Sequence, residues 1–105
     1  MAEVVLLNDP ENYQRVALRI KRLWKDGVVE FTVHAQQRMR QRRFDVTDID
    51  NIIRCGRVTE HSCPRGRWRY TIRGKTVAGN NAEVVVEING SLVIVSAIRC
   101  PAVRR

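Results

Sequence analysis

Apolar side chains recur at helical spacing in the first half of the chain. Between positions 10 and 26 they fall at intervals of three and four residues: Tyr13, Val16, Ala17, Ile20, Leu23 and Trp24. This pattern predicts an amphipathic helix over residues 10–26, with Asp9 as N-cap, Pro10 in the first turn and Gly27 at the end. A more polar second helix is predicted over residues 34–43. A third is predicted over residues 48–56, with Thr47 as N-cap and Asp50 reaching back to it.

From residue 57 onward the hydrophobic period changes to two, which predicts strands. They are expected over 57–61, 67–73, 82–88 and 92–98, with a further short one over 76–79 and turns at 64–66 and 74–75. We expect a three-residue loop in the last hairpin, because that register gathers large apolar side chains on one face: Val84, Val86, Leu92, Ile94 and Ile98. The alternative is a two-residue turn that pairs Glu87 with Leu92. Helices followed by antiparallel strands indicate one α+β domain over residues 1–105, with a sheet of about four strands.

Composition narrows the class of protein. The 105 residues are 44% hydrophobic, enough for a core, and no apolar run approaches the roughly 20 residues of a membrane helix. The three cysteines form no Cys-x-x-Cys pair, which argues against a disulfide framework and a standard zinc site. We therefore expect reduced thiols, a cytoplasmic location, and no metal or other cofactor.

The positive charge is concentrated in two windows. Nineteen Lys and Arg residues stand against 11 Asp and Glu, which gives a net charge of +8. Residues 34–43 and residues 64–79 hold four and five basic side chains, respectively, and neither window contains an acid. A GC-rich genome would explain the preference for Arg over Lys but not the missing acids. The pattern indicates a nucleic acid or another acidic partner.

The first basic window contains a candidate catalytic group. His34, Arg38 and Arg42 stand at i, i+4 and i+8, so they share one face of the predicted helix. Neutral imidazole can act as a general base, and guanidinium groups can hold a phosphate and stabilise its developing charge. Metal-independent RNA cleavage needs these groups. The alternative is that His34 caps or packs the helix start while the arginines are merely solvated.

The second basic window lies on a predicted strand. Alternation places Arg67, Arg69 and Arg73 on one face as a track for an RNA backbone, and Trp68 on the opposite, core-facing side with Tyr70 and Ile72. The alternative is a solvated sheet face whose arginines pair with Glu83 and Glu87.

Residues 60–63 give weaker indications. Glu60 is a candidate catalytic base or an orienting partner for an arginine, although a plain ion pair is the simpler interpretation. His61 and Cys63 have the spacing of half a metal site, but no second pair stands at a usual distance, so no metal site is predicted.

Over residues 31–99 the sequence resembles a bacterial family catalogued as a domain of unknown function and grouped with the RelE/ParE-like toxins. The resemblance rests on His34-Ala35-Gln36-Gln37-Arg38-Met39-Arg40-Gln41-Arg42, on the capped helix that ends at Gly56, on Trp68-Arg69-Tyr70, and on the hairpin that begins at Val84-Val85-Val86-Glu87. It implies a small α+β fold with helices packed on one sheet face, related to microbial ribonucleases.

The resemblance also implies a function. The expected protein is the toxin of a type II toxin–antitoxin pair, an RNA endonuclease, and the resemblance implies an antitoxin partner such as a small zinc-finger protein. His34, Arg38 and Arg42 are then functional, and Arg69 and Tyr70 fall at the family's strand positions. The sequence departs from some toxin relatives, because it lacks their Lys-rich surface and catalytic C-terminal residue. The alternative function is a non-catalytic basic module that binds nucleic acid or an acidic protein.

Overall fold

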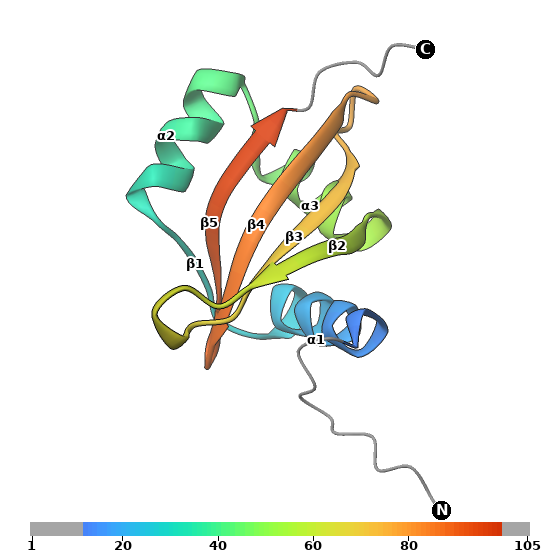
Figure 1. Cartoon of the computed structure of the whole chain (residues 1–105). Coiled ribbons are helices and arrows are strands. Elements are labelled where there is room, and N and C mark those ends of the chain that lie inside the picture. The colour runs from blue at the N-terminus through green and yellow to red at the C-terminus, as the bar shows by residue number, and fades with distance from the viewer. Residues whose placement is uncertain (1–11, 100–105) are drawn as a thin grey trace, which may run out of the picture.

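A computed structural model describes residues 12–99, which form three helices and a five-stranded sheet (Figure 1). The elements follow one another as α1 (Tyr13–Asp26), β1 (Val29–Phe31), α2 (Val33–Arg42), α3 (Val46–Cys55), β2 (Arg57–Ser62), a short 3₁₀ turn η1 (Pro64–Gly66), β3 (Arg69–Lys75), β4 (Asn81–Asn89) and β5 (Ser91–Arg99). Figure 1 shows α3 behind the sheet, α1 across its lower end and α2 beside β5, whereas no described element covers the front face. The fold is α+β, as the sequence predicts.

The sheet has the order β1-β5-β4-β3-β2, and its composition corrects the prediction of about four antiparallel strands. β1 pairs with β5 in parallel, from Val29 opposite Leu92 to Phe31 opposite Ile94, so the sheet is mixed. A strand of three residues carries too little alternation to be recognised in the sequence, and its partner lies far along the chain.

The connection between β3 and β4 also differs from the prediction. β3 continues through the predicted turn at 74–75, where Gly74 pairs with Ala82 and Lys75 with Asn81. The predicted strand over 76–79 is instead the turn itself, in which the Thr76 N–H donates to the Asn80 carbonyl at 2.8 Å. The strand prediction for 76–79 was therefore wrong, because its polar and glycine residues close a turn rather than pair with a neighbour.

The β4–β5 hairpin has the expected three-residue loop. Ile88 lies opposite Leu92, and the inward face is formed by fully buried side chains: Val84, Val86, Leu92, Ile94 and Ala97. Ile98 was predicted to lie on this face, but it does not and is 39% exposed. The register shifts between Val85 and Val86, so that one extra residue of β5 moves Ala97 into the place opposite Val84.

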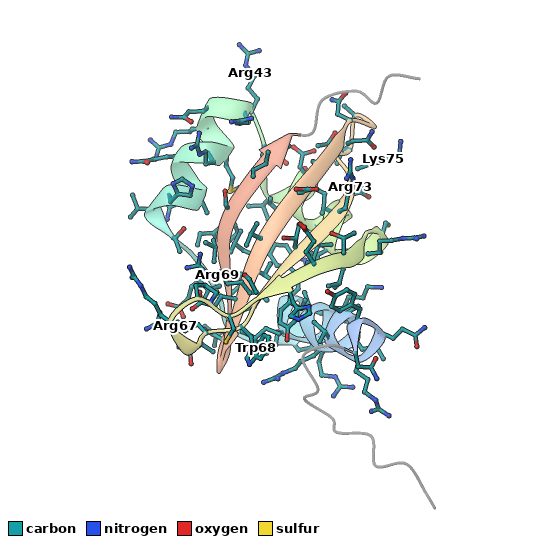
Figure 2. The ribbon with its side chains drawn as sticks, in the orientation of Figure 1. Arg43, Arg67, Trp68, Arg69, Arg73 and Lys75 are labelled. Atoms are coloured by element: carbon teal, nitrogen blue, oxygen red, sulfur yellow. The ribbon has the colours of Figure 1, made fainter. Side chains whose placement is uncertain are left out.

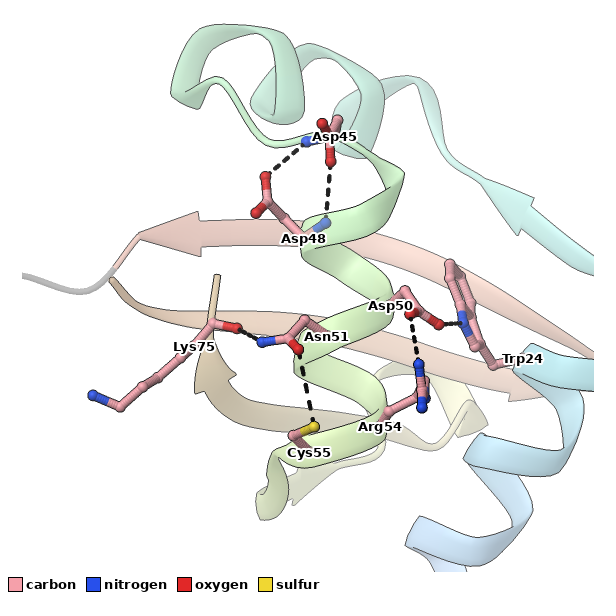
Figure 3. Close-up of polar contacts among 8 residues, drawn as sticks. All are labelled: Trp24, Asp45, Asp48, Asp50, Asn51, Arg54, Cys55 and Lys75. Carbon is pink, nitrogen blue, oxygen red and sulfur yellow. Dashed lines mark hydrogen bonds and ion pairs between the residues drawn. The ribbon is translucent and has the colours of Figure 1, made fainter. Parts of the chain in front are cut away.

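Two helix starts differ from the predicted caps. Asn12 caps α1 by accepting the Arg15 N–H at 3.3 Å, whereas the predicted cap Asp9 and Pro10 lie outside the described residues. Asp45, not Thr47, caps α3, and its capping-box partner is Asp48 rather than Asp50 (Figure 3). The Thr47 hydroxyl and the Asp48 N–H both donate to the Asp45 carboxylate and lower its pKa.

α3 is tied to the sheet and to α1 by side-chain hydrogen bonds (Figure 3). The Asn51 amide donates to the Lys75 carbonyl at 2.7 Å, and the Trp24 indole N–H donates to Asp50 at 2.8 Å. At its end α3 touches β3 so closely that a Cβ on Gly56 would lie 2.6 Å from the Arg73 carbonyl oxygen. These contacts hold α3 against the sheet and against α1, while α2 lies beside β5 (Figure 1).

Candidate nucleic-acid interface

The start of α2 presents a histidine to solvent. Thr32 caps the helix by accepting the Ala35 N–H at 3.0 Å and donates to the Val95 carbonyl of β5 at 3.1 Å, while Ala35 is fully buried. This anchoring turns His34 outward, where it is exposed and neither caps the helix nor packs in the core. The alternative that His34 caps the helix or packs at its start is therefore wrong.

Arg38 contacts His34 as the i, i+4 spacing predicts. Its Nε–H points to His34 Nε2 at 3.5 Å, the outer limit of a hydrogen bond, and its Nη1 lies 3.4 Å from the Gln41 side-chain oxygen. Arg42 follows on the same helix and is half-buried. A weak contact of this kind leaves the imidazole nitrogen available to another partner once Arg38 turns toward an anion.

Three arginines of α2 and its C-cap have no acidic side chain of the described residues within ion-pairing distance. Among residues 12–99, no carboxylate lies within 4 Å of Arg38, Arg40 or Arg43. Arg43 takes a left-handed conformation at the end of α2, with φ of 58°, and Figure 2 shows its side chain pointing away from the body of the protein. These three arginines thus carry positive charge without a carboxylate of the described residues beside them, and they can attract phosphate.

The strand arginines have a different environment, because each is paired with a glutamate of β4. Arg69 Nε lies 2.9 Å and Arg67 Nη1 3.5 Å from the carboxylate of Glu87, whose side chain is only 5% exposed. Arg73 Nη1 lies 3.6 Å from Glu83. The interpretation of this face as paired with Glu83 and Glu87 is therefore confirmed for the geometry, and the basic track is partly neutralised.

Arg67 and Arg69 nevertheless remain able to contact a ligand. Arg69 uses only Nε for Glu87, which leaves its terminal nitrogens as donors, and the Arg67 side chain is 64% exposed. Figure 2 shows both at one end of β3, while Arg73 and Lys75 lie at the other end. Phe31, the last residue of β1, shares one row of the sheet with Ile94, Val86 and Tyr70, so Arg69 is one residue from this row along β3 and Arg73 is three.

The sheet order separates residues that the sequence placed in one candidate site. Glu60 lies on β2 and α2 follows β1, and these two strands are the opposite edges of the sheet, about 19 Å apart at ordinary strand spacing. Glu60 therefore does not reach His34. Arg69 is three strand spacings from β1, about 14 Å, so an anion bound between His34 and Arg69 must be extended.

Two aromatic side chains of this segment lie in different environments. Tyr70 is 4% exposed and belongs to the core, as the strand alternation predicts, so the nucleic-acid-binding role that the resemblance suggests for it has no exposed ring to support it. Trp68, expected in the core, precedes β3 and is 37% exposed. The strand begins only at Arg69, so Trp68 lies just outside the end of β3.

Sequence reasoning missed the partners of His61. The Tyr13 hydroxyl of α1 lies 2.6 Å from His61 Nδ1, and the His61 and Trp68 rings lie 5.7 Å apart at 41°. Nothing local in the sequence indicates the contact, because Tyr13 and His61 are 48 positions apart. Within the described part of the chain, no three His, Cys, Asp or Glu side chains gather as metal ligands would.

An apolar groove of about 350 Å³ runs between β1, α2 and the start of α3. Its lining combines four apolar side chains with two polar ones: Phe31, Met39, Phe44 and Val46, with Gln36 and Arg40. Val46 is 55% exposed, so the groove offers apolar surface beside an uncompensated cation.

The comparisons with known proteins bear on this part of the chain. Residues 31–99 match the family described as Domain of unknown function (DUF4258). The chain belongs to this family. The DUF4258 match begins at β1 and ends with β5, and therefore includes the His34–Arg38 pair and the arginines around Glu87, but not α1. No curated protein and no solved structure matches the chain. No helix within residues 12–99 has the length and apolar character of a membrane span.

Proposed function

We propose that this DUF4258 protein is a metal-independent RNA endonuclease, the toxin of a type II toxin–antitoxin pair, with the exposed face of α2 as its phosphate-binding surface. The observation that carries the proposal is the His34–Arg38 contact, with no carboxylate of the described residues within 4 Å of Arg38. A potential base and a phosphate-binding cation are thereby joined on one exposed helix face.

The proposed reaction is transfer of the RNA phosphate to its own 2′-hydroxyl. His34 removes the 2′-proton, the 2′-oxygen attacks the adjacent phosphorus, and the 5′-oxygen leaves and takes a proton from solvent. The products are a 2′,3′-cyclic phosphate and a 5′-hydroxyl end. Arg38 turns from His34 Nε2 to the phosphate and stabilises its developing charge, while Arg67 and Arg69 hold the chain further along.

The proposal also covers the superfamily and the protein partner. We place the fold among RelE/ParE-like toxins, which fits helices on one face of a small sheet with an uncovered opposite face. A toxin of this kind acts in the cytoplasm and is held by an antitoxin. The groove beside Met39 and Arg40 suits such a partner, because an acidic segment with large apolar side chains would match both its lining and its charge.

The decisive experiment compares wild-type protein with His34→Ala. Expressed alone in a bacterial host, the wild type is expected to stop growth and degrade RNA, and coexpression of the neighbouring gene is expected to restore growth. In purified form with a chelator present, His34→Ala is expected to cleave RNA about 10²- to 10⁴-fold more slowly, the usual effect of losing a general base. Because His34 is exposed, the free energy of unfolding should change by no more than about 0.5 kcal/mol.

Arg22→Ala is a matched control, because Arg22 is an exposed cation of α1 away from the proposed site. Its cleavage rate should equal that of the wild type. An unchanged rate in His34→Ala would exclude His34 as the base.

The second candidate function is RNA binding without cleavage. It is favoured by the ion pairs of Arg69 with Glu87 and of Arg73 with Glu83, because paired arginines can still contact a phosphate but have less charge with which to stabilise the charge that develops during cleavage. Wild-type protein that binds RNA but leaves it intact would establish this function in place of the first.

A further inference from the structure

Three aromatic rings from separate parts of the chain form a cluster beside the β2–β3 connection. Tyr13 comes from α1, His61 from β2, and Trp68 immediately precedes β3. The Tyr13 and His61 rings meet edge to face at 5.6 Å and 73°, and the phenol hydroxyl lies 2.6 Å from His61 Nδ1. His61 in turn contacts the Trp68 ring at 5.7 Å.

This cluster holds Trp68 in place without burying it. The backbone of Trp68 is fixed as well, since its carbonyl accepts the Ile88 N–H of β4 at 3.4 Å. The residue still exposes 37% of its surface, although a tryptophan that served only packing would gain by burying more. A rigid, exposed indole loses little conformational entropy when a flat partner stacks on it.

The charges around Trp68 indicate the chemistry of that partner. Arg65 and Arg67 precede it in a connection without acids, and no carboxylate within the described residues lies within 4 Å of Arg65. Arg65 adopts a left-handed conformation, with φ of 56°, and is exposed. Figure 2 shows Arg67, Trp68 and Arg69 gathered at the same end of the sheet. Cations flanking an accessible ring are the arrangement that binds single-stranded nucleic acid.

The geometry points to Trp68 as a platform on which one base of single-stranded RNA stacks, with Arg65 and Arg67 contacting the neighbouring phosphates. This inference rests on the proposed function and deepens it, because it identifies where the substrate is held outside the α2 face. Cleavage chemistry is not required of Trp68, so the inference can be tested by binding alone.

The two tryptophans of the chain make the test direct. In a Trp24→Phe background, Trp68 is the only indole fluorophore, and titration with a single-stranded ten-nucleotide oligouridine or oligoadenylate should quench its emission. Trp68→Leu should weaken binding of the same oligonucleotides by about 5- to 150-fold, the usual effect of losing one stacked base. Trp68→Phe keeps an aromatic ring and should retain most of the affinity.

Trp24→Phe is the matched control for binding, because Trp24 belongs to α1 and its indole N–H donates to Asp50 of α3. Circular dichroism establishes that each variant is folded. If Trp68→Leu did not fold, the affinity of Trp68→Phe relative to wild type and the quenching of Trp68 emission would decide whether Trp68 stacks on a base. Equal affinity of Trp68→Leu and wild type, or no quenching on binding, would overturn the platform and leave the proposed function intact. Wild-type protein with no affinity for RNA would overturn both.

Discussion

At the scale of single residues, the least expected feature is Glu87. It is a carboxylate with a 5% exposed side chain on a sheet face that no described helix covers, and the side chains of Arg67 and Arg69 close over it. The burial is tolerable because charged donors satisfy both carboxylate oxygens. Glu87 thereby holds two arginines, two positions apart in the sequence, beside each other, which prepares them for a common anion.

The two arginines should differ in their effect on stability. Arg69→Ala removes the closer donor, 2.9 Å from Glu87, and leaves a buried carboxylate with one weak partner, so we expect a loss of about 1–3 kcal/mol. Arg67→Ala removes a more exposed donor at 3.5 Å and should cost less than about 1 kcal/mol. Urea unfolding at neutral pH measures both. Equal losses would contradict the inequality of the two contacts.

At the scale of elements, the end of α3 is fixed by glycines. A Cβ on Gly56 would lie 2.5 Å from the Ile52 carbonyl oxygen and 2.6 Å from that of Arg73, and one on Gly74 would lie 3.2 Å from the Gly56 Cα. Only glycine permits α3 and β3 to approach so closely. The approach lets the Ile49, Ile52 and Ile53 stripe reach the sheet, where all three side chains are buried.

We therefore expect Gly56→Ala to destabilise the protein by about 1–3 kcal/mol, because neither carbonyl can move without shifting its element. Cys55→Ala, at the preceding exposed position, is the control and should change stability by no more than about 0.5 kcal/mol. Thermal unfolding followed by circular dichroism compares the two. A Gly56→Ala protein as stable as Cys55→Ala would show that the helix end can relax.

At the scale of the whole molecule, the net charge of +8 is unevenly compensated. Arg67, Arg69 and Arg73 share their charge with Glu83 and Glu87, whereas no carboxylate of the described residues lies within 4 Å of Arg38, Arg40 or Arg43. Electrostatic attraction of RNA should consequently be strongest over α2, although more arginines line the strand and its preceding connection. The number of cations in a region of this surface therefore does not by itself predict how strongly that region attracts RNA.

This difference predicts the salt dependence of RNA binding. Each phosphate contact to single strands adds about 0.7 to the slope of log affinity against log salt, so Arg38→Ala should reduce the slope by about that amount. Arg22→Ala should leave the slope unchanged, since α1 carries this cation away from the site. Fluorescence anisotropy over a salt series gives the slopes. If Arg38→Ala and wild type had the same slope, α2 would not bind phosphate.

The elements themselves were largely predictable because their information is local. The spacing of Val16 and Ile20, the Ile49 stripe and the alternation of Val84 and Val86 each describe one buried face, and all are buried in the structure. The same holds for the His34–Arg38 contact, which needs only one turn of helix. Asp45 was missed as a cap because Asp and Thr are both favoured cap residues, and two of them stand close together at the start of this helix; the hydrogen bonds identify Asp45 as the cap.

The sequence by itself determined the α+β class, the three helices, the long hairpin and the two basic windows, since each depends on side chains a few residues apart. Only the tertiary structure decided that β1 lies beside β5, that Glu60 and His34 occupy opposite edges, that Glu87 binds two arginines, and that Trp68 rather than Tyr70 is accessible. The physical reason is that strand order results from how the whole chain buries its apolar surface at once, and this competition leaves no periodic trace in any single segment.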